Sequence, residues 1–398
     1  MTSGSEGDTG GPSSARGRRP VGLRPFLLYF LRLGTLGFGG PIALAGYMQR
    51  DLVEERGWIT SQDYLEGLAL AQLAPGPLAA QLAIYLGWVR AGVMGATLVA
   101  AAFITPSFLM VLAISGFYLR YGGLPWMQGV FYGIGAAVIA IIARSAVKLM
   151  RSTLRSNRLL WALFITSAVT TAWTETEIVW IFVLCGVIAL GAEALPHRTA
   201  AALGLAPWPL WLITGLHGPA EPGTLWRIWM YFAQAGAFVF GSGLAIVPFL
   251  HGGVVGHFHW LSERQFLDAV AVAMITPGPV VITVAFIGYL VAGPVGAAAA
   301  ALGVFLPCYL FVIIPAPYYH RVVGNRYVRA FVGGVTAAAV GAIAGATLIL
   351  GKRAVTDVPT AAIALLTLMV LSTTRKVPEP LLILVAGGIG ILLSGRVR

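Results

Sequence analysis

Long apolar runs separated by short polar breaks fill the chain from residue 26 onward. A run of about twenty apolar residues is long enough for a helix to cross a membrane, so the pattern predicts an all-α polytopic membrane protein. The predicted spans are 26–48, 63–89, 92–119, 126–148, 159–174, 176–194, 226–250, 266–290, 293–316, 328–350, 355–374 and 378–395. A shorter run at 200–217 contains two prolines and fits a membrane span or an interfacial segment, which gives 12 or 13 transmembrane helices.

The second set of runs repeats the first. At a constant offset of 202 positions, ten residues of the first half meet identical residues in the second, including Trp58 with Trp260, and after one deletion the offset of 201 matches Pro106 with Pro307. Chance similarity between apolar stretches would not hold such residues in one register, so the chain is predicted to be a duplication. The expected division is a disordered basic tail at 1–25, a first repeat at 26–195, a connector at 196–225 and a second repeat at 226–398.

Each half carries two breaks inside its apolar runs. One is a Pro-Gly-Pro sequence, at 75–77 and again at 277–279, and the other is a glycine cluster, at 37–41 and 240–243. Proline removes a backbone donor, and broken helices inside a membrane are tolerated where they line a cavity. Paired interruptions in two halves point to a transporter binding site. A half-helix that begins after such a break has free amides and a positive end, so the expected ligand is an anion.

The predicted substrate-binding residues lie in or beside these four breaks. They are Arg32, Gly39, Gly40, Pro41, Gln72, Pro75, Gly76, Pro77, Gln81, Gly241, Ser242, Gly243, Thr276, Pro277, Gly278, Pro279 and Thr283. Arg32 either attracts the anion or extends to the membrane interface, and the uncharged polar side chains either contact the ligand or join helices. Glu66 and its counterpart Asp268 are predicted to couple protons or gate the path, with a helix N-terminus at the interface as the alternative.

Composition and charge agree with a membrane protein. Hydrophobic residues make up 58% of the chain and charged residues 10%, and the mean hydropathy is +0.83. The net charge of +11 does not predict a nucleic-acid partner, because the basic residues are scattered at the ends of apolar runs, where they meet lipid and orient the protein. Cationic loops at 144–158 and 321–329 fall after different helices of the two halves, which predicts inverted repeats, although Lys352 and Arg353 oppose this scheme.

Other sequence features add no chemistry. The two cysteines lie in apolar segments and read as buried packing residues, and three histidines at 251–259 lack the partners of a metal site, so no metal or cofactor is predicted. The chain has none of the nucleophile or metal motifs of membrane enzymes, so it is not predicted to be an enzyme. A Gly-x-x-x-Gly motif at 341–345 joins helices within the bundle or in a homodimer.

Several motifs together resemble the two-domain form of the chromate ion transporter family. They are Phe38-Gly39-Gly40-Pro41, the segment 54–58, Gln72-Leu73-Ala74-Pro75-Gly76-Pro77, Ile84-Tyr85-Leu86-Gly87 and their second copies. The resemblance implies a bacterial or archaeal inner-membrane protein that exports chromate and confers chromate resistance, with its N-terminus in the cytoplasm. The family often has a histidine where this chain has Leu44. Composition and spacing do not separate chromate from sulfate, and a passive anion channel stays an alternative.

Overall fold

The structure is a computed structural model. It describes residues 22–38, 40–121, 125–155, 157–174, 179–194, 221–238, 246–319, 324–373, 377 and 379–394. These residues form helices and turns with no strand, so the predicted all-α class is confirmed. Residues 1–21 of the tail predicted at 1–25, the run at 200–217 and the second glycine cluster at 240–243 lie outside the described residues, while residues 23–25 of the predicted tail belong to the first helix.

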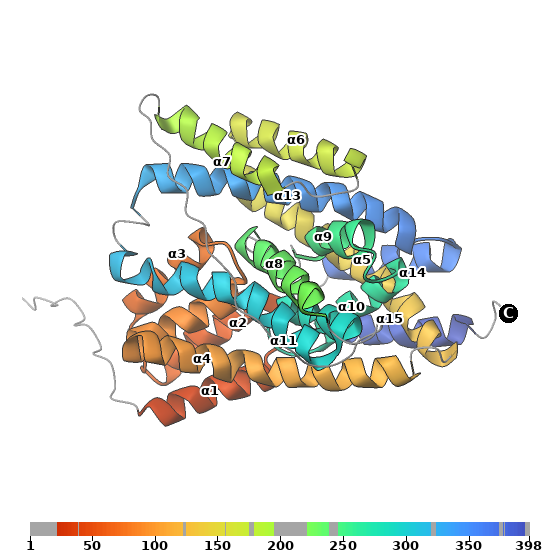
Figure 1. The fold of residues 1–398 in the computed structure, drawn as a ribbon, viewed down its shortest axis with the longest axis horizontal. Helices are drawn as coiled ribbons and strands as arrows, with labels where there is room; N and C mark the ends of the chain where they lie inside the picture. The colour runs from red at the N-terminus through yellow and green to blue at the C-terminus, as the bar shows by residue number, and fades with distance from the viewer. Residues whose placement is uncertain are drawn as a thin grey trace, which may run out of the picture.

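The two halves have the same order of helices (Figure 1). The first half contains α1 (Leu23–Leu36), α2 (Gly40–Met48) with π-turns at Gln49–Glu55, α3 (Ser61–Leu73), α4 (Leu78–Tyr121), α5 (Pro125–Leu154), α6 (Arg158–Thr174) and α7 (Val179–Ala194). The second half contains α8 (Pro222–Phe238), α9 (Ile246–His251), α10 (Glu263–Ile275), a 3-10 turn at Val280–Ile282, α11 (Thr283–Ile313), α13 (Arg326–Ala354), α14 (Val358–Thr373) and α15 (Glu379–Ser394). Four of the described helical segments are long and apolar enough to cross a membrane, namely Leu78–Tyr121, Trp126–Leu154, Val280–Tyr318 and Arg326–Lys352.

The chain reverses direction at the predicted breaks. The Tyr85 hydroxyl donates a hydrogen bond to the Glu66 carboxylate at 3.2 Å, although 19 positions separate the two residues. In a straight helix they would be about 28 Å apart at 1.5 Å per residue. α3 and the start of α4 therefore form a helical hairpin with Pro-Gly-Pro at its tip. The sequence reads 63–89 as one interrupted crossing, and this reversal revises that interpretation.

Helices α8 and α9, on either side of the second glycine cluster, are in contact. The Tyr231 hydroxyl on α8 donates to the Phe249 carbonyl on α9 at 2.8 Å. The sequence also reads 226–250 as one interrupted crossing, but the described parts of this run lie beside each other. The first glycine cluster and both Pro-Gly-Pro segments interrupt helices where the sequence predicts it, because proline and glycine act locally, but the direction of the chain after each break depends on packing.

A second sharp turn divides α4, and another divides α11. Gly92 and Gly293 have φ values of 58° and 64°, which favour glycine. A Cβ atom on Gly95 would lie 2.2 Å from the Gly87 carbonyl oxygen, so the two segments of α4 touch through backbone. The sequence predicts a boundary here, between 63–89 and 92–119, and the turn falls at that position.

The second segments of α4 and α11 pack against each other and run in opposite directions (Figure 1). Thr97 near the start of one segment is bonded to the Tyr309 hydroxyl near the end of the other at 2.6 Å. Toward the other end of α4, a side chain on Gly116 would meet the hydroxyl of Tyr289, which lies just before the turn in α11. Because α4 and α11 are equivalent helices of the two repeats, their antiparallel arrangement is the one that inverted repeats require.

The two halves also exchange packing partners. Helix α5 of the first half packs against α14 and α15 of the second, and α13 packs against α6 and α7 of the first (Figure 1). The Gly-x-x-x-Gly motif contributes to this contact, because Gly341 and Gly345 face the α6 backbone at Phe164 and Ala168. Glycine lets these helix backbones approach closely. The motif therefore joins helices within this chain, and the interlocked helices surround the hairpin tips.

Candidate functional site

Two hairpin tips from different halves meet inside the molecule. The Gly278 amide of the second Pro-Gly-Pro donates a hydrogen bond to the Gly37 carbonyl of the first glycine cluster at 2.9 Å. Gly278 has a φ of 100°, and a Cβ atom there would lie 1.9 Å from the Ser107 hydroxyl. Both the positive φ and the lack of room for a Cβ atom thus require glycine at this position. Two breaks that are about 240 positions apart in the sequence form one structural unit.

The tips are fitted to the long helices of the opposite half by matching contacts. Ser107 on α4 donates to the Gly34 carbonyl at 3.2 Å, and a side chain on Gly278 would strike it. The equivalent Cys308 on α11 lies 3.6 Å from the Gly236 carbonyl, and a Cβ on Gly76 would be 2.9 Å from its sulfur. Cys308 is buried, as the sequence predicts. Ser107 is missed by the sequence, although each of the two residues directly follows a proline of the repeat.

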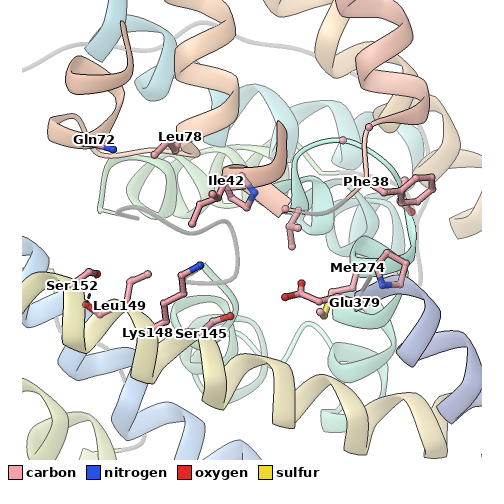
Figure 2. A pocket seen from close by; sticks show the side chains of 17 residues that line it. Phe38, Ile42, Gln72, Leu78, Ser145, Lys148, Leu149, Ser152, Met274 and Glu379 are labelled. Atoms are coloured by element: carbon pink, nitrogen blue, oxygen red, sulfur yellow. Dashed lines mark hydrogen bonds between the residues drawn. The ribbon is translucent and has the colours of Figure 1, made fainter. Parts of the chain in front are cut away.

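A cavity of about 310 Å³ lies beside the joined tips (Figure 2). This volume is at the lower end of the range for small-ligand pockets. Its lining comes from the first glycine cluster, the second Pro-Gly-Pro, α5 and the first turn of α15. The lining residues are Gly37, Phe38, Gly40, Pro41, Ile42, Gln72, Leu78, Ser145, Lys148, Leu149, Ser152, Met274, Thr276, Gly278, Val280, Glu379 and Pro380.

Five of the predicted site residues line this cavity, and they come from both halves. They are Gly40, Pro41, Gln72, Thr276 and Gly278. The Gln72 side chain is exposed to the open space, while Thr276 is buried and bonds the Val272 carbonyl at 2.6 Å. Gly40, with a φ of 75°, begins α2. The structure thus brings together one break of each half, and two further polar groups lie beside them.

Other predicted residues hold the tips in shape. The fully buried Gln81 amide donates to the Pro75 carbonyl at 2.5 Å, across the first Pro-Gly-Pro. The Thr283 hydroxyl donates to the Val280 carbonyl at 2.8 Å. Arg32 is exposed on α1 and is not among the described residues that line the cavity. The tip residues Pro75, Gly76, Pro77, Pro277 and Pro279 are buried or half-buried, and Gly39, Gly241, Ser242 and Gly243 lie outside the described residues.

The charged groups of the cavity are ones that the sequence does not single out. The sequence places residues 144–158 in a cationic loop, but α5 continues to Leu154, so Arg144, Lys148 and Arg151 lie within a helix. Ser145, Lys148 and Ser152 line the cavity from one face of α5. Their spacing of three and four positions is the available sequence signal for a polar helix face.

Glu66 and Asp268 lie away from this cavity, each near a tyrosine of the opposite half. Asp268 is 3% exposed and accepts a hydrogen bond from the Tyr118 hydroxyl at 2.6 Å. Glu66 is half-buried and lines a second cavity, of about 440 Å³, together with Tyr319. Tyr118 and Tyr319 are 201 positions apart, so they are equivalent residues of the two repeats. Each acid therefore faces the end of a long helix from the other half.

Comparison with known proteins identifies the chain's relatives. The model of the family described as "Chromate transporter" matches twice, at residues 25–190 and 226–391. The chain belongs to the chromate transporter family. A protein of Cupriavidus metallidurans named "Chromate transport protein" is 57% identical over 93% of this chain and 93% of its own length. A "Probable chromate transport protein" of Synechococcus elongatus is 53% identical over 94% and 96%, and a "Chromate transport protein" of Pseudomonas aeruginosa is 32% identical over 85% and 84%.

Membership of the chromate transporter family confirms the resemblance seen in the motifs. The two matches, one in each half, also confirm the duplication. Family members are transporters and not enzymes. No solved structure matches the chain, so the arrangement of the hairpin tips is described from this protein's own geometry. The long apolar helices of this chromate transporter family member make it a multi-pass membrane protein.

Proposed function

We propose that this protein exports chromate from the cytoplasm across the bacterial inner membrane and that the anion binds in the cavity beside the hairpin tips. The observation that carries the proposal is the cavity itself, in which backbone of two helix breaks, uncharged donors and Lys148 surround one small space. The relatives named for chromate transport, at 53 and 57% identity over nearly the whole chain, support chromate as the substrate.

The groups around the cavity suit an oxyanion with four oxygens. α2 begins at Gly40 and α4 at Leu78, both in the lining, and the first amides of a helix have no partner within it. These amides and the positive helix ends favour a negative charge. Gln72 and Ser145 supply further donors without a fixed charge, whereas the Ser152 hydroxyl donates to the Leu149 carbonyl at 2.9 Å. Lys148 supplies a full positive charge, which neutral donors do not provide.

The membrane potential favours the outward direction. A dianion that leaves a cytoplasm held at ~100 mV negative gains about 4.6 kcal/mol, since each charge gains about 2.3 kcal/mol. At 1.36 kcal/mol per tenfold, this corresponds to a concentration ratio of roughly a thousand-fold or more. A selective path therefore suffices for export. Coupling to protons would add to the driving force without being required.

The central test removes the charge of the cavity. We expect Lys148→Gln to lower chromate uptake into everted membrane vesicles at least about tenfold, because a hydrogen bond to a charged group is worth about 1.5–3 kcal/mol. The matched control is Lys352→Gln, whose side chain is exposed at the end of α13. Unchanged chromate uptake in Lys148→Gln would place the binding site elsewhere.

The same vesicles separate the alternative functions. An excess of sulfate should compete with chromate only weakly if chromate is the substrate. Sulfate uptake without chromate uptake would instead identify a sulfate carrier of the same fold. Electrical recording of the reconstituted protein addresses the passive channel, because a carrier gives slow, saturable flux and no unitary currents.

A further inference from the structure

A carboxylate lies in the cavity that we propose for a dianion. Glu379, in the first turn of α15, lines the cavity together with Lys148. Figure 2 shows the Lys148 amine and the Glu379 carboxylate reaching into the same space from different walls. A fixed negative charge at this place repels an anionic substrate. A cavity that only had to bind the anion tightly would have no use for this group.

Two cations of α5 act on the Glu379 carboxylate. The Glu379 side chain is half-buried, which disfavours a charge, and the nearby positive charges of Arg144 and Lys148 offset part of the cost of keeping its carboxylate ionised. The three groups are kept near one another by the backbone, because α15 packs along α5, and Gly390 and Gly133 let the two helices touch. Among the described residues that line the cavity, Glu379 is the one carboxylate, so it is the negative group available to Lys148 when no substrate is bound. The oxyanion and the Glu379 carboxylate therefore compete for Lys148.

The geometry points to Glu379 as a tethered counter-anion. It neutralises Lys148 in the empty cavity and is displaced by the incoming oxyanion. When it returns to Lys148, it displaces the oxyanion in turn. This inference rests on the proposed function, since it concerns the same cavity. Its physical basis is competition, because any group that must be displaced lowers the affinity of the ligand that displaces it. Transport requires binding that is strong enough for entry and weak enough for release. Glu379 makes binding weak enough for release.

A purely structural role for Glu379 predicts different behaviour. An acid in the first turn of a helix interacts favourably with the helix dipole. If this were its whole contribution, Glu379→Gln would lower the stability or the yield of the protein and leave its anion affinity unchanged. Affinity and turnover, measured separately, therefore distinguish the two roles.

The experiment measures chromate binding to the purified full-length protein by equilibrium dialysis and chromate transport in proteoliposomes. We expect Glu379→Gln to bind chromate about tenfold more tightly, within the range usual for coupled sites, and to show a lower KM together with a lower maximal rate. Glu379→Asp keeps the charge at the helix N-terminus with a shorter reach, so it should fall between Glu379→Gln and the wild type. The matched control is Glu55→Gln, since Glu55 lies in an exposed segment beside Arg50.

The outcomes separate the inference from the proposed function. If both Glu379 variants bind chromate as the wild type does, or more weakly, the counter-anion role is overturned while the cavity stays the binding site. Should Glu379→Gln fail to fold, the affinity of Glu379→Asp decides the matter alone. A wild-type protein that binds neither chromate nor sulfate overturns the proposed function and, with it, this inference.

Discussion

The two halves of this protein share a scaffold but differ in the side chains that the scaffold presents. In both halves a Pro-Gly-Pro tip packs against the long helix of the other half, at Ser107 in one case and at Cys308 in the other. The cation of the cavity has no such counterpart. Phe131 and Phe331 place α5 and α13 in register at an offset of 200, and Lys148 then corresponds to Leu348. Duplication thus accounts for the shared backbone architecture. Later divergence accounts for the presence of this positive charge in the first half only.

The acid and tyrosine pairs show a second difference between the halves. The Asp268 carboxylate is bonded to Tyr118 and is almost fully buried, whereas Glu66 and Tyr319 both line an open cavity of about 440 Å³. In inverted repeats, equivalent positions face opposite sides of the membrane. The structure therefore has one closed pair and one open pair. A carrier that alternates between two states, as an alternative to a passive channel, would show such an asymmetry between the halves.

The largest effect is expected at the contact between the tips. Gly278→Ala should abolish chromate transport and lower stability by about 1–3 kcal/mol, because a Cβ would clash with Ser107 and the positive φ would be strained. Gly76→Ala is strained as well, because Gly76 has a φ of 135°, but its Cβ would come no closer than 2.6 Å to Gln81, against 1.9 Å at Gly278, so the loss should be smaller. Thermal unfolding of the purified variants and vesicle flux measure both effects.

Gly223→Ala is the control for this pair, because a Cβ there meets nothing within 4 Å. Equal losses in Gly278→Ala and Gly76→Ala would show that the two tips are equivalent, against the comparison drawn above.

The next effect concerns the closed and open acid pairs. Asp268→Ala should lower the free energy of unfolding by about 1.5–3 kcal/mol, the usual cost of losing a hydrogen bond to a charged group, because alanine leaves the Tyr118 hydroxyl without its acceptor. Glu66→Gln should cost less, because its carboxylate lies beside an open cavity and its side chain is only half-buried. Chemical denaturation of the two variants measures the difference.

Transport by the same two variants tests whether either acid couples protons. If Glu66 carries a proton, Glu66→Gln should remove the dependence of chromate flux on a pH gradient while leaving binding intact. A variant with normal stability and an unaltered pH-gradient dependence would contradict this role.

A cross-link extends the comparison to motion. Cysteines at positions 118 and 268 should be bridged readily by a short bifunctional thiol reagent in the resting protein and stop transport when joined, because the native tyrosine and aspartate side chains span this gap and are in contact. Cysteines at 66 and 319 should be joined more slowly. Reversed rates would mean that the resting protein in the membrane occupies the opposite state.

The smallest effect is expected inside the hairpins. Gln81→Leu should destabilise the protein by about 1–2 kcal/mol, because it removes the buried hydrogen bond to the Pro75 carbonyl. Thr283→Val should cost less than about 1 kcal/mol, since its bond is to a carbonyl only three residues away. Thermal unfolding measures both changes. A larger loss in Thr283→Val would show that the second hairpin depends more on its side chain than the first.

The positions of the breaks were predictable from the sequence, whereas the site was predictable only in part. Gly40, Gln72 and Thr276 were found because they lie beside proline or glycine breaks, which are local signals. Lys148 and Glu379 were not, because each lies at the end of an apolar run, where charged residues normally face lipid headgroups or water. Only the position of α5 and α15 beside the tips turns these residues toward a common cavity.

The sequence by itself determined the membrane class, the duplication and the positions of the four interruptions. Hydropathy, the repeat offset and the effect of proline on a helix all follow from residue types and their order along the chain. Tertiary structure alone decided that the chain reverses at the interruptions, that Gly278 meets Gly37, and that each half packs its helices on the other. These features depend on contacts between residues far apart along the chain. No local pattern encodes which distant backbone will approach, since that is settled by the packing of the whole bundle.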